Sequence, residues 1–117
     1  LLIVVICPAC KFSNRSNQDV LYVVQTEVKV KPGTVPEVLE LFETTNPALV
    51  SGQEDWVKAS FSVYEEENIV VVRAYWKKKS SYKAFSESEE FKEVMSHFGR
   101  YFVEKPQVTI SKILFEM

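Results

Sequence analysis

Histidine, cysteine and glycine are scarce in this chain of 117 residues, and each scarcity argues against a class of site. The one histidine, His97, has no Cys-His cluster around it, so the sequence offers no set of metal ligands. Three glycines form neither a phosphate-binding loop nor a Gly-x-Ser-x-Gly nucleophile motif. We therefore expect no cofactor: no metal, haem, flavin or nicotinamide.

Strong net charge and long hydrophobic runs are also missing. The formal net charge is −2 and the pI is about 5.5, so there is no general basic field to hold a nucleic acid. The apolar run at residues 1–6 is far shorter than the roughly 20 residues that span a membrane, and it lacks the features of a signal peptide. We expect neither nucleic-acid nor membrane partners. Two cysteines make no disulfide framework, which predicts a reducing, cytoplasmic setting.

The amino-terminal segment differs in character from the rest. Cys7 and Cys10 form a Cys-x-x-Cys pair, for which three interpretations stay open: an inert extension, a redox-active or incidental disulfide, or half of a metal site. The polar run at 11–19 is typical of a linker. We predict an extension and linker over residues 1–19 and one compact domain over 20–117.

The domain alternates strand and helix signals in a definite order. Period-two alternation predicts strands at 21–30, 56–64, 69–76 and 108–116. A capping box from Thr34 to Glu37 starts a helix that Asn46 and Pro47 should end, followed by a connection over 48–55. A second helical segment starts at Ser80 or Ser81 and ends near residue 102. The fold class is therefore α+β: a ferredoxin-like βαββαβ domain with an antiparallel sheet.

The two faces of that sheet carry different residues. One face is nearly all apolar and must be covered by both helices. The other mixes apolar with charged groups, which is typical of an interface. We predict a homodimer through this second face, formed by Val23, Trp56, Ile69, Val71, Arg73 and Tyr75.

Three short stretches carry a resemblance to a known family: residues 28–33 at the end of the first strand, Tyr75-Trp76 at the end of the third, and Phe91-Lys92 in the second helix. Together they resemble the antibiotic biosynthesis monooxygenase family of the dimeric α+β barrel superfamily, over about residues 20–117. The resemblance implies the ferredoxin-like fold, a dimeric α+β barrel and a small cofactor-independent oxygenase acting on aromatic polyketides or quinols.

The chain departs from the family's catalytic pattern. Haem-degrading relatives use an Asn on the first strand and a Trp and a His on the second helix, and these places hold Thr26, Phe85 and Met95. Other members carry a His at about the place of Phe85. No catalytic residue of the family is therefore recognisable, and the catalytic residues stay unknown.

Two functions follow for the space between the helices and the sheet. It is predicted to form a mostly apolar ligand pocket with Trp76, Tyr22, Tyr82, Phe91 and Met95, and with Thr26 or Gln25 at its edge. In the first of the two functions, the protein is a cofactor-independent monooxygenase for a small aromatic, quinol or polyketide-like substrate. In the alternative, it is a non-catalytic dimeric barrel that holds a small aromatic ligand or serves a structural role.

Overall fold

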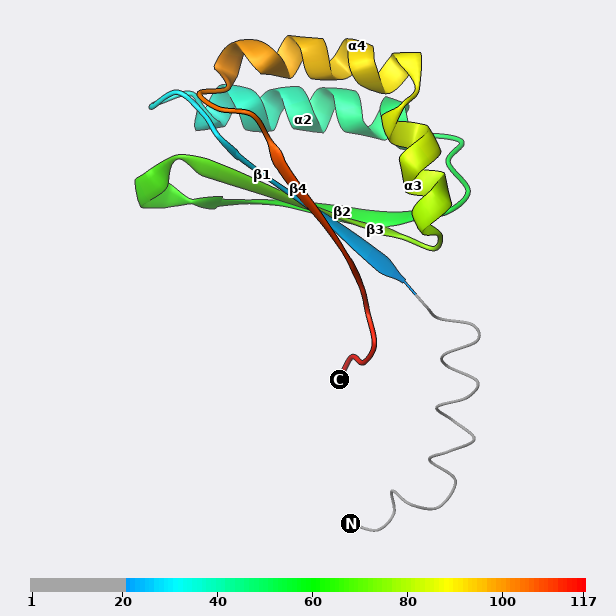
Figure 1. Ribbon diagram of the computed structural model, residues 1–117. Coiled ribbons are helices and arrows are strands. Elements are labelled where there is room, and N and C mark those ends of the chain that lie inside the picture. Colours follow the sequence, from blue (N-terminus) through cyan, green and yellow to red (C-terminus); the bar gives the residue numbers. More distant parts are fainter. Residues whose placement is uncertain (1–20) are drawn as a thin grey trace, which may run out of the picture.

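The computed structural model describes residues 21–117, in which a four-stranded sheet lies beneath a layer of helices (Figure 1). The elements are β1 (Tyr22–Lys29), α2 (Val35–Val50), β2 (Trp56–Tyr64), β3 (Ile69–Trp76), α3 (Lys79–Ser86), α4 (Glu89–Phe98) and β4 (Gln107–Lys112). All neighbouring strands are antiparallel, in the order β2-β3-β1-β4. This confirms the predicted ferredoxin-like βαββαβ fold. The extension with Cys7 and Cys10, and the linker after it, lie outside the described residues.

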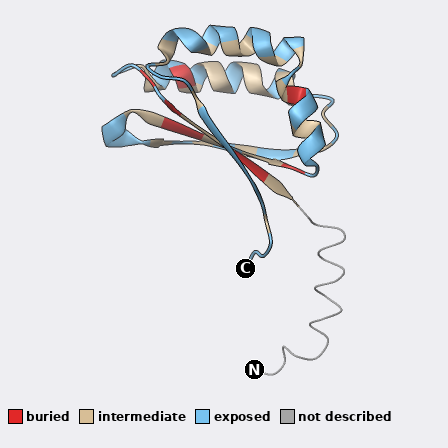
Figure 2. Ribbon diagram, viewed as in Figure 1, coloured by how far each residue is buried: buried red, intermediate tan, exposed pale blue. Residues whose placement is uncertain are grey.

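Two clusters of buried residues join the helices to the sheet. Val28, Val30 and Val70 pack with Val38 of α2 at one end, where α2 begins. At the other end Val24 and Trp76 pack with Phe85 of α3, whose buried segment is visible in Figure 2. β-Branched side chains fit the pleated surface of the two central strands, which is why β1 and β3 supply most of this core. The two clusters therefore hold the helix layer against the sheet at both ends. Neither cluster fills the space between those ends.

A β-bulge changes which way the start of β2 faces. Trp56 pairs with Trp76 and Lys58 pairs with Tyr75, so Val57 is an extra residue in the β2 strand. An extra residue breaks the period-two alternation. Trp56 consequently lies on the helix-covered face, packed against the Trp76 cluster. The prediction that Trp56 belongs to the open, interface face is therefore wrong.

Helix α2 differs from its prediction at both ends. Thr34 makes no side-chain cap; its hydroxyl instead donates to the carbonyl of Lys31 at 2.6 Å, so the predicted capping box does not form. The helix also continues through Pro47 to Val50, so the connection predicted over 48–55 begins only after it. Pro47 removes one backbone hydrogen bond, but Leu49 and Val50 pack against the Trp76 cluster. We attribute the longer helix to this packing.

The second helical segment is two helices rather than one. α3 ends at Ser86, and Ser88 begins α4 by accepting a hydrogen bond from the Phe91 backbone N–H at 3.2 Å. A serine N-cap of this kind satisfies a helix-terminal donor, so the break is built into the sequence. β4 also stops at Lys112, before the end of the predicted strand.

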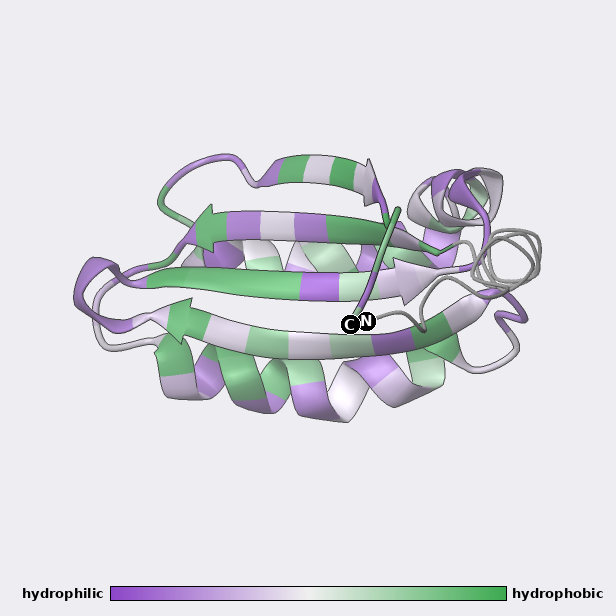
Figure 3. Cartoon of the chain, turned by 90° about the horizontal axis from the view of Figure 1, so that it is seen from below, coloured by the Kyte–Doolittle hydropathy of each residue, from purple (hydrophilic) through white to green (hydrophobic). Residues whose placement is uncertain are grey.

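None of the helices within residues 21–117 covers the opposite face of the sheet, which Figure 3 shows from below. Arg73 and Lys58 are exposed there, with the Lys58 Nζ 4.8 Å from the centre of the Tyr75 ring. Val23 and Val71 lie on this face too, yet they are only 6% and 4% exposed. The face, called the open face below, is thus a charged surface around two buried valines. Within residues 21–117, none of the helices is long and apolar enough to cross a bilayer.

Candidate functional site

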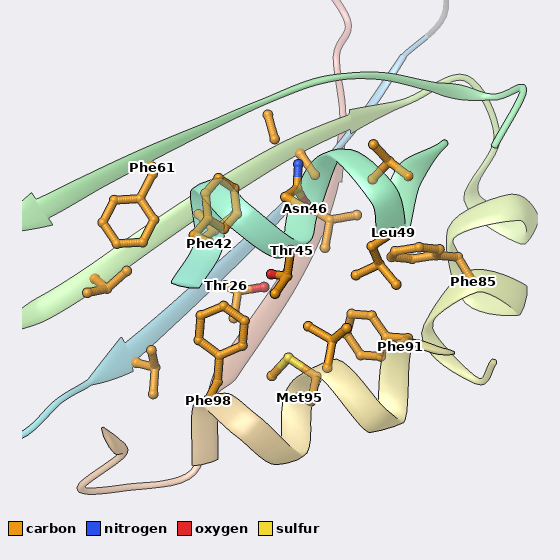
Figure 4. A pocket seen from close by; sticks show the side chains of 18 of the residues that line it. Thr26, Phe42, Thr45, Asn46, Leu49, Phe61, Phe85, Phe91, Met95 and Phe98 are labelled. Carbon is orange, nitrogen blue, oxygen red and sulfur yellow. The ribbon is translucent and has the colours of Figure 1, made fainter. Parts of the chain in front are cut away.

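A cavity of about 140 Å³ lies between the helix layer and the covered face of the sheet (Figure 4). Its walls come from β1, β2 and β3 on one side and from α2, α3 and α4 on the other. A dry cavity of about 150 Å³ in another protein is known to hold benzene. The space is therefore large enough for one aromatic ring.

Aromatic side chains form the end of the cavity beside α3. The Trp76 ring lies 5.1 Å from that of Phe85 and 5.9 Å from that of Tyr82, and Phe85 lies 5.2 Å from Phe91. These centroid distances are typical of tilted and edge-to-face pairs. Trp76 is 1% exposed, and its indole Nε1 is a buried polar atom that has no hydrogen-bond partner among the described residues. Buried donors are normally paired, so this end of the cavity holds an unused donor.

α3 is fastened at this end through Asp55, which precedes β2. The Asp55 carbonyl accepts a hydrogen bond from the Lys77 N–H at 2.7 Å, and its carboxylate accepts one from the Ser81 hydroxyl. These contacts join the start of β2 to the loop before α3 and to the first turn of this helix, which also carries Tyr82 and, one turn later, Phe85. The aromatic wall is thus positioned by a polar contact on its outer side.

Three polar residues, Thr26, Thr45 and Asn46, interrupt the apolar lining away from the aromatic end. Thr26 comes from the middle of β1, and Thr45 and Asn46 come from α2 (Figure 4). The Thr45 hydroxyl donates to the Leu41 carbonyl at 2.7 Å. Neither the Thr26 hydroxyl nor the Asn46 amide bonds to another described residue.

Among the described residues, the cavity lining carries no carboxylate, amine or imidazole. Its one titratable group is Tyr82, and burial raises the pKa of that phenol because burial disfavours the charged form. His97, the single histidine, is exposed and does not line the cavity. Among the described residues no three His, Cys, Asp or Glu side chains gather as metal ligands would. The site can offer hydrogen bonds and an apolar surface, but no strong base.

The structure brings most of the predicted pocket residues together. Trp76, Tyr82, Phe91 and Met95 line the cavity, whereas Tyr22 does not, although it faces the same side of the sheet as Trp76. The three places of the family's haem-degrading residues, Thr26, Phe85 and Met95, also line it.

Sequence reasoning missed several lining residues on α2 and the bulged Trp56. The α2 residues recur at helical spacing, which was the available signal, but ending the helix at Pro47 hid its last member. The additional lining residues from these and neighbouring elements include Phe42, Thr45, Asn46, Leu49, Trp56, Phe61 and Phe98.

Comparison with known proteins gives one family and a set of similar folds. The family model described as antibiotic biosynthesis monooxygenase matches residues 21–96, more than half of the chain. No protein of curated function matches the sequence.

Solved structures with the same fold share little sequence with this chain. A conserved protein from Methanosarcina mazei is 19% identical, with a TM-score of 0.68 over 79% of this chain and 91% of that one. A protein from Nitrosomonas europaea described as a candidate antibiotic biosynthesis monooxygenase is 12% identical, with a TM-score of 0.70 over 81% and 91%. A similarly described protein from Caulobacter crescentus is 18% identical, with a TM-score of 0.67 over 84% and 95%. At these identities the likeness shows the fold.

Proposed function

This chain belongs to the antibiotic biosynthesis monooxygenase family, and on that basis we propose that it binds a small neutral aromatic molecule in its helix–sheet cavity and promotes oxidation of that molecule by O₂ without a bound cofactor. The observation that carries the proposal is the unpaired, buried Trp76 indole N–H at the aromatic end of the cavity. A buried donor without a partner costs about 1–3 kcal/mol. A ligand oxygen that accepted this hydrogen bond would recover that energy.

The lining favours a flat, uncharged ligand. Phe85 and Phe91 offer ring faces and edges beside Trp76, and apolar side chains from the sheet close the other side. Because no cation lines the cavity, a carboxylate or phenolate would lose its hydration without compensation. The ligand class is therefore a phenol, quinol or related ketone rather than an anion.

Oxidation of such a substrate needs no other reductant. When a phenol is converted to a quinone, the ring loses one C–H and one O–H hydrogen, one atom of O₂ becomes the new carbonyl oxygen, and the other leaves as water. The substrate supplies all four electrons. The protein's part would be to hold the ring beside Trp76 and to exclude bulk water while O₂ reacts. Tyr82, kept protonated by burial, can donate a hydrogen bond but is a poor base.

The second candidate function is non-catalytic binding, and one observation favours it. Removing the phenolic proton in the cavity would require a base, and the lining supplies none. A pocket that binds a neutral aromatic and leaves it unchanged needs only the groups that are present. The absence of a base among the lining residues therefore favours binding without catalysis over oxidation.

Oxygen consumption and ligand binding, measured together, test the proposal. Purified protein is titrated with hydroquinones and 1-naphthol while an electrode records O₂ uptake and tryptophan fluorescence records binding. We expect saturable quenching and an O₂ uptake rate above that of the free quinol, both reduced in Trp76→Phe. Quenching without added O₂ uptake would leave the non-catalytic function, and no quenching with any ligand would overturn both.

We further propose that two copies associate through their open faces to form a barrel. Supporting this, none of the described helices covers the open face, Ile69 and Tyr75 are partly exposed on it, and the family resemblance implies dimers. Val23 and Val71, which we predicted as contact residues, are already buried within the chain and would add little new contact area. Tyr75, Arg73 and Ile69 are then the central contact residues. The cytoplasmic setting stays a prediction.

A further inference from the structure

We propose that Asn46 is a specificity-determining residue, which together with Thr45 and Thr26 binds a neutral hydroxyl or carbonyl group of the ligand. This inference rests on the proposed ligand-binding function of the cavity. It concerns a place remote from the Trp76 donor along the sheet, since Thr26 pairs with Val72, four residues before Trp76 on β3. It therefore adds a second polar contact point to the site.

The three residues provide complementary hydrogen-bonding groups. The Thr45 hydroxyl already donates to the Leu41 carbonyl, so its oxygen is left to accept. The Asn46 amide and the Thr26 hydroxyl can each donate and accept, and neither bonds to another described residue. A ligand hydroxyl both donates and accepts, so it could pair with a donor or with an acceptor among these residues. Thr26 lies on the sheet and Thr45 and Asn46 lie on the facing helix; the Thr45 hydroxyl points toward Thr26, whereas the Asn46 amide points to the other side of the helix (Figure 4).

Asn46 has no structural reason to be an asparagine. It lies inside α2, where asparagine is a weaker helix former than leucine by a few tenths of a kcal/mol. Its partly buried side chain lines a mostly apolar cavity without a hydrogen-bond partner among residues 21–117. Leucine has nearly the same shape and would satisfy this environment better. A residue that lowers stability without forming a contact is expected where function requires it.

The ligand group at this point should be uncharged. Neither Thr26, Thr45 nor Asn46 carries charge, and no Lys, Arg or His lines the cavity. A carboxylate placed there would lose water and gain no counter-ion. Phenols and ring ketones fit the chemistry, whereas benzoates do not.

The test compares two ligands of equal size that differ in one group: phenol and toluene. Their dissociation constants are measured by calorimetry for the full chain and for Asn46→Leu and Thr26→Val, each of which removes polarity at nearly constant shape. We expect the Kd of phenol to rise about 3- to 10-fold in each variant, the loss of one ordinary hydrogen bond. The Kd of toluene should stay within about twofold, and benzoate should not bind. Leu49→Val, one turn further along α2, serves as the matched control and should shift both ligands in parallel.

A thermal melt gives a second readout. Asn46→Leu should melt at the same temperature as the parent chain or higher, because the amide contributes no contact that leucine lacks. If both variants leave the ratio of the two dissociation constants unchanged, or if Asn46→Leu melts markedly lower, the inference is wrong while the proposed function stands. If the parent chain binds neither phenol nor toluene, both fail.

Discussion

The helix-covered and open faces of the sheet are built from the same four strands, but they do different things. The covered face carries the valines of both core clusters, two tryptophans and the cavity. The open face, one residue out of phase along each strand, carries Lys58, Arg73 and Tyr75. The contrast teaches that strand alternation places residues on one face or the other. The ligand cavity forms only on the face that the helices cover. The three predictions below test this division, starting with the largest effect.

Substitutions at Trp56 and Lys58 test whether the bulge at Val57 places these two residues on opposite faces of the sheet. Because Trp56 packs in the Trp76 cluster, Trp56→Ala should lower the free energy of unfolding by about 2–3 kcal/mol. Lys58→Ala, two residues along on the open face, should change it by no more than about 0.5 kcal/mol. Urea denaturation measures both. Equal, small losses would mean that Trp56 faces outward and that the bulge is absent.

Tyr75→Glu tests the open face as a contact between copies. In the single chain the new carboxylate would stand opposite Lys58, its partner in the β2–β3 register, so the fold should be retained. In a dimer the same change removes an aromatic ring and buries charge, and we expect the dimer Kd to rise about 10-fold or more. Sedimentation velocity over a concentration series measures this, with Lys92→Glu on the outer surface of α4 as control. A parent chain that stays monomeric at micromolar concentration would contradict the dimer.

Tyr82 gives the smallest effect, on the pH dependence of stability. Burial raises the pKa of the folded Tyr82 above the ordinary value near 10, so the unfolded chain loses this proton first as pH rises. The phenol's contribution is therefore complete below pH 10 and declines above it. Melting temperatures from pH 8 to 11 should fall more steeply for the parent chain than for Tyr82→Phe. Parallel curves would show that the Tyr82 phenol is not buried in solution.

Much of this fold could be predicted from local pattern, because alternation and helical spacing are properties of neighbouring residues. The order of elements and the position of the pocket beside Trp76 both followed from such patterns. The bulge at Val57 did not, since an extra residue leaves no local mark and depends on how β2 pairs with β3. The continuation of α2 through Pro47 also depended on distant packing, which outweighed a local helix-stop signal.

The polar part of the cavity was harder still to predict. Asn46 was interpreted as half of a helix stop, so its place in the cavity lining could not be foreseen. Thr26 could be matched to a family position, but its partners on α2 could not. The pocket lies between secondary-structure elements, and hydrophobic periodicity predicts each element without predicting which residues of two elements face one another.

The burial of the Trp76 N–H affects the rates of ligand binding and release as well as the affinity. The Trp76 Nε1 is fully buried and its ring packs against Tyr82 and Phe85 of α3, so a ligand oxygen reaches this atom only after neighbouring side chains move aside. The rate of capture at this donor would then follow how often α3 moves away, not how often ligand and protein collide. Asp55, which holds the start of α3 through Ser81, lies well placed to set that frequency. The partly buried hydrogen bond between Ser81 and Asp55 would in this way influence how long a ligand takes to enter and how long it stays.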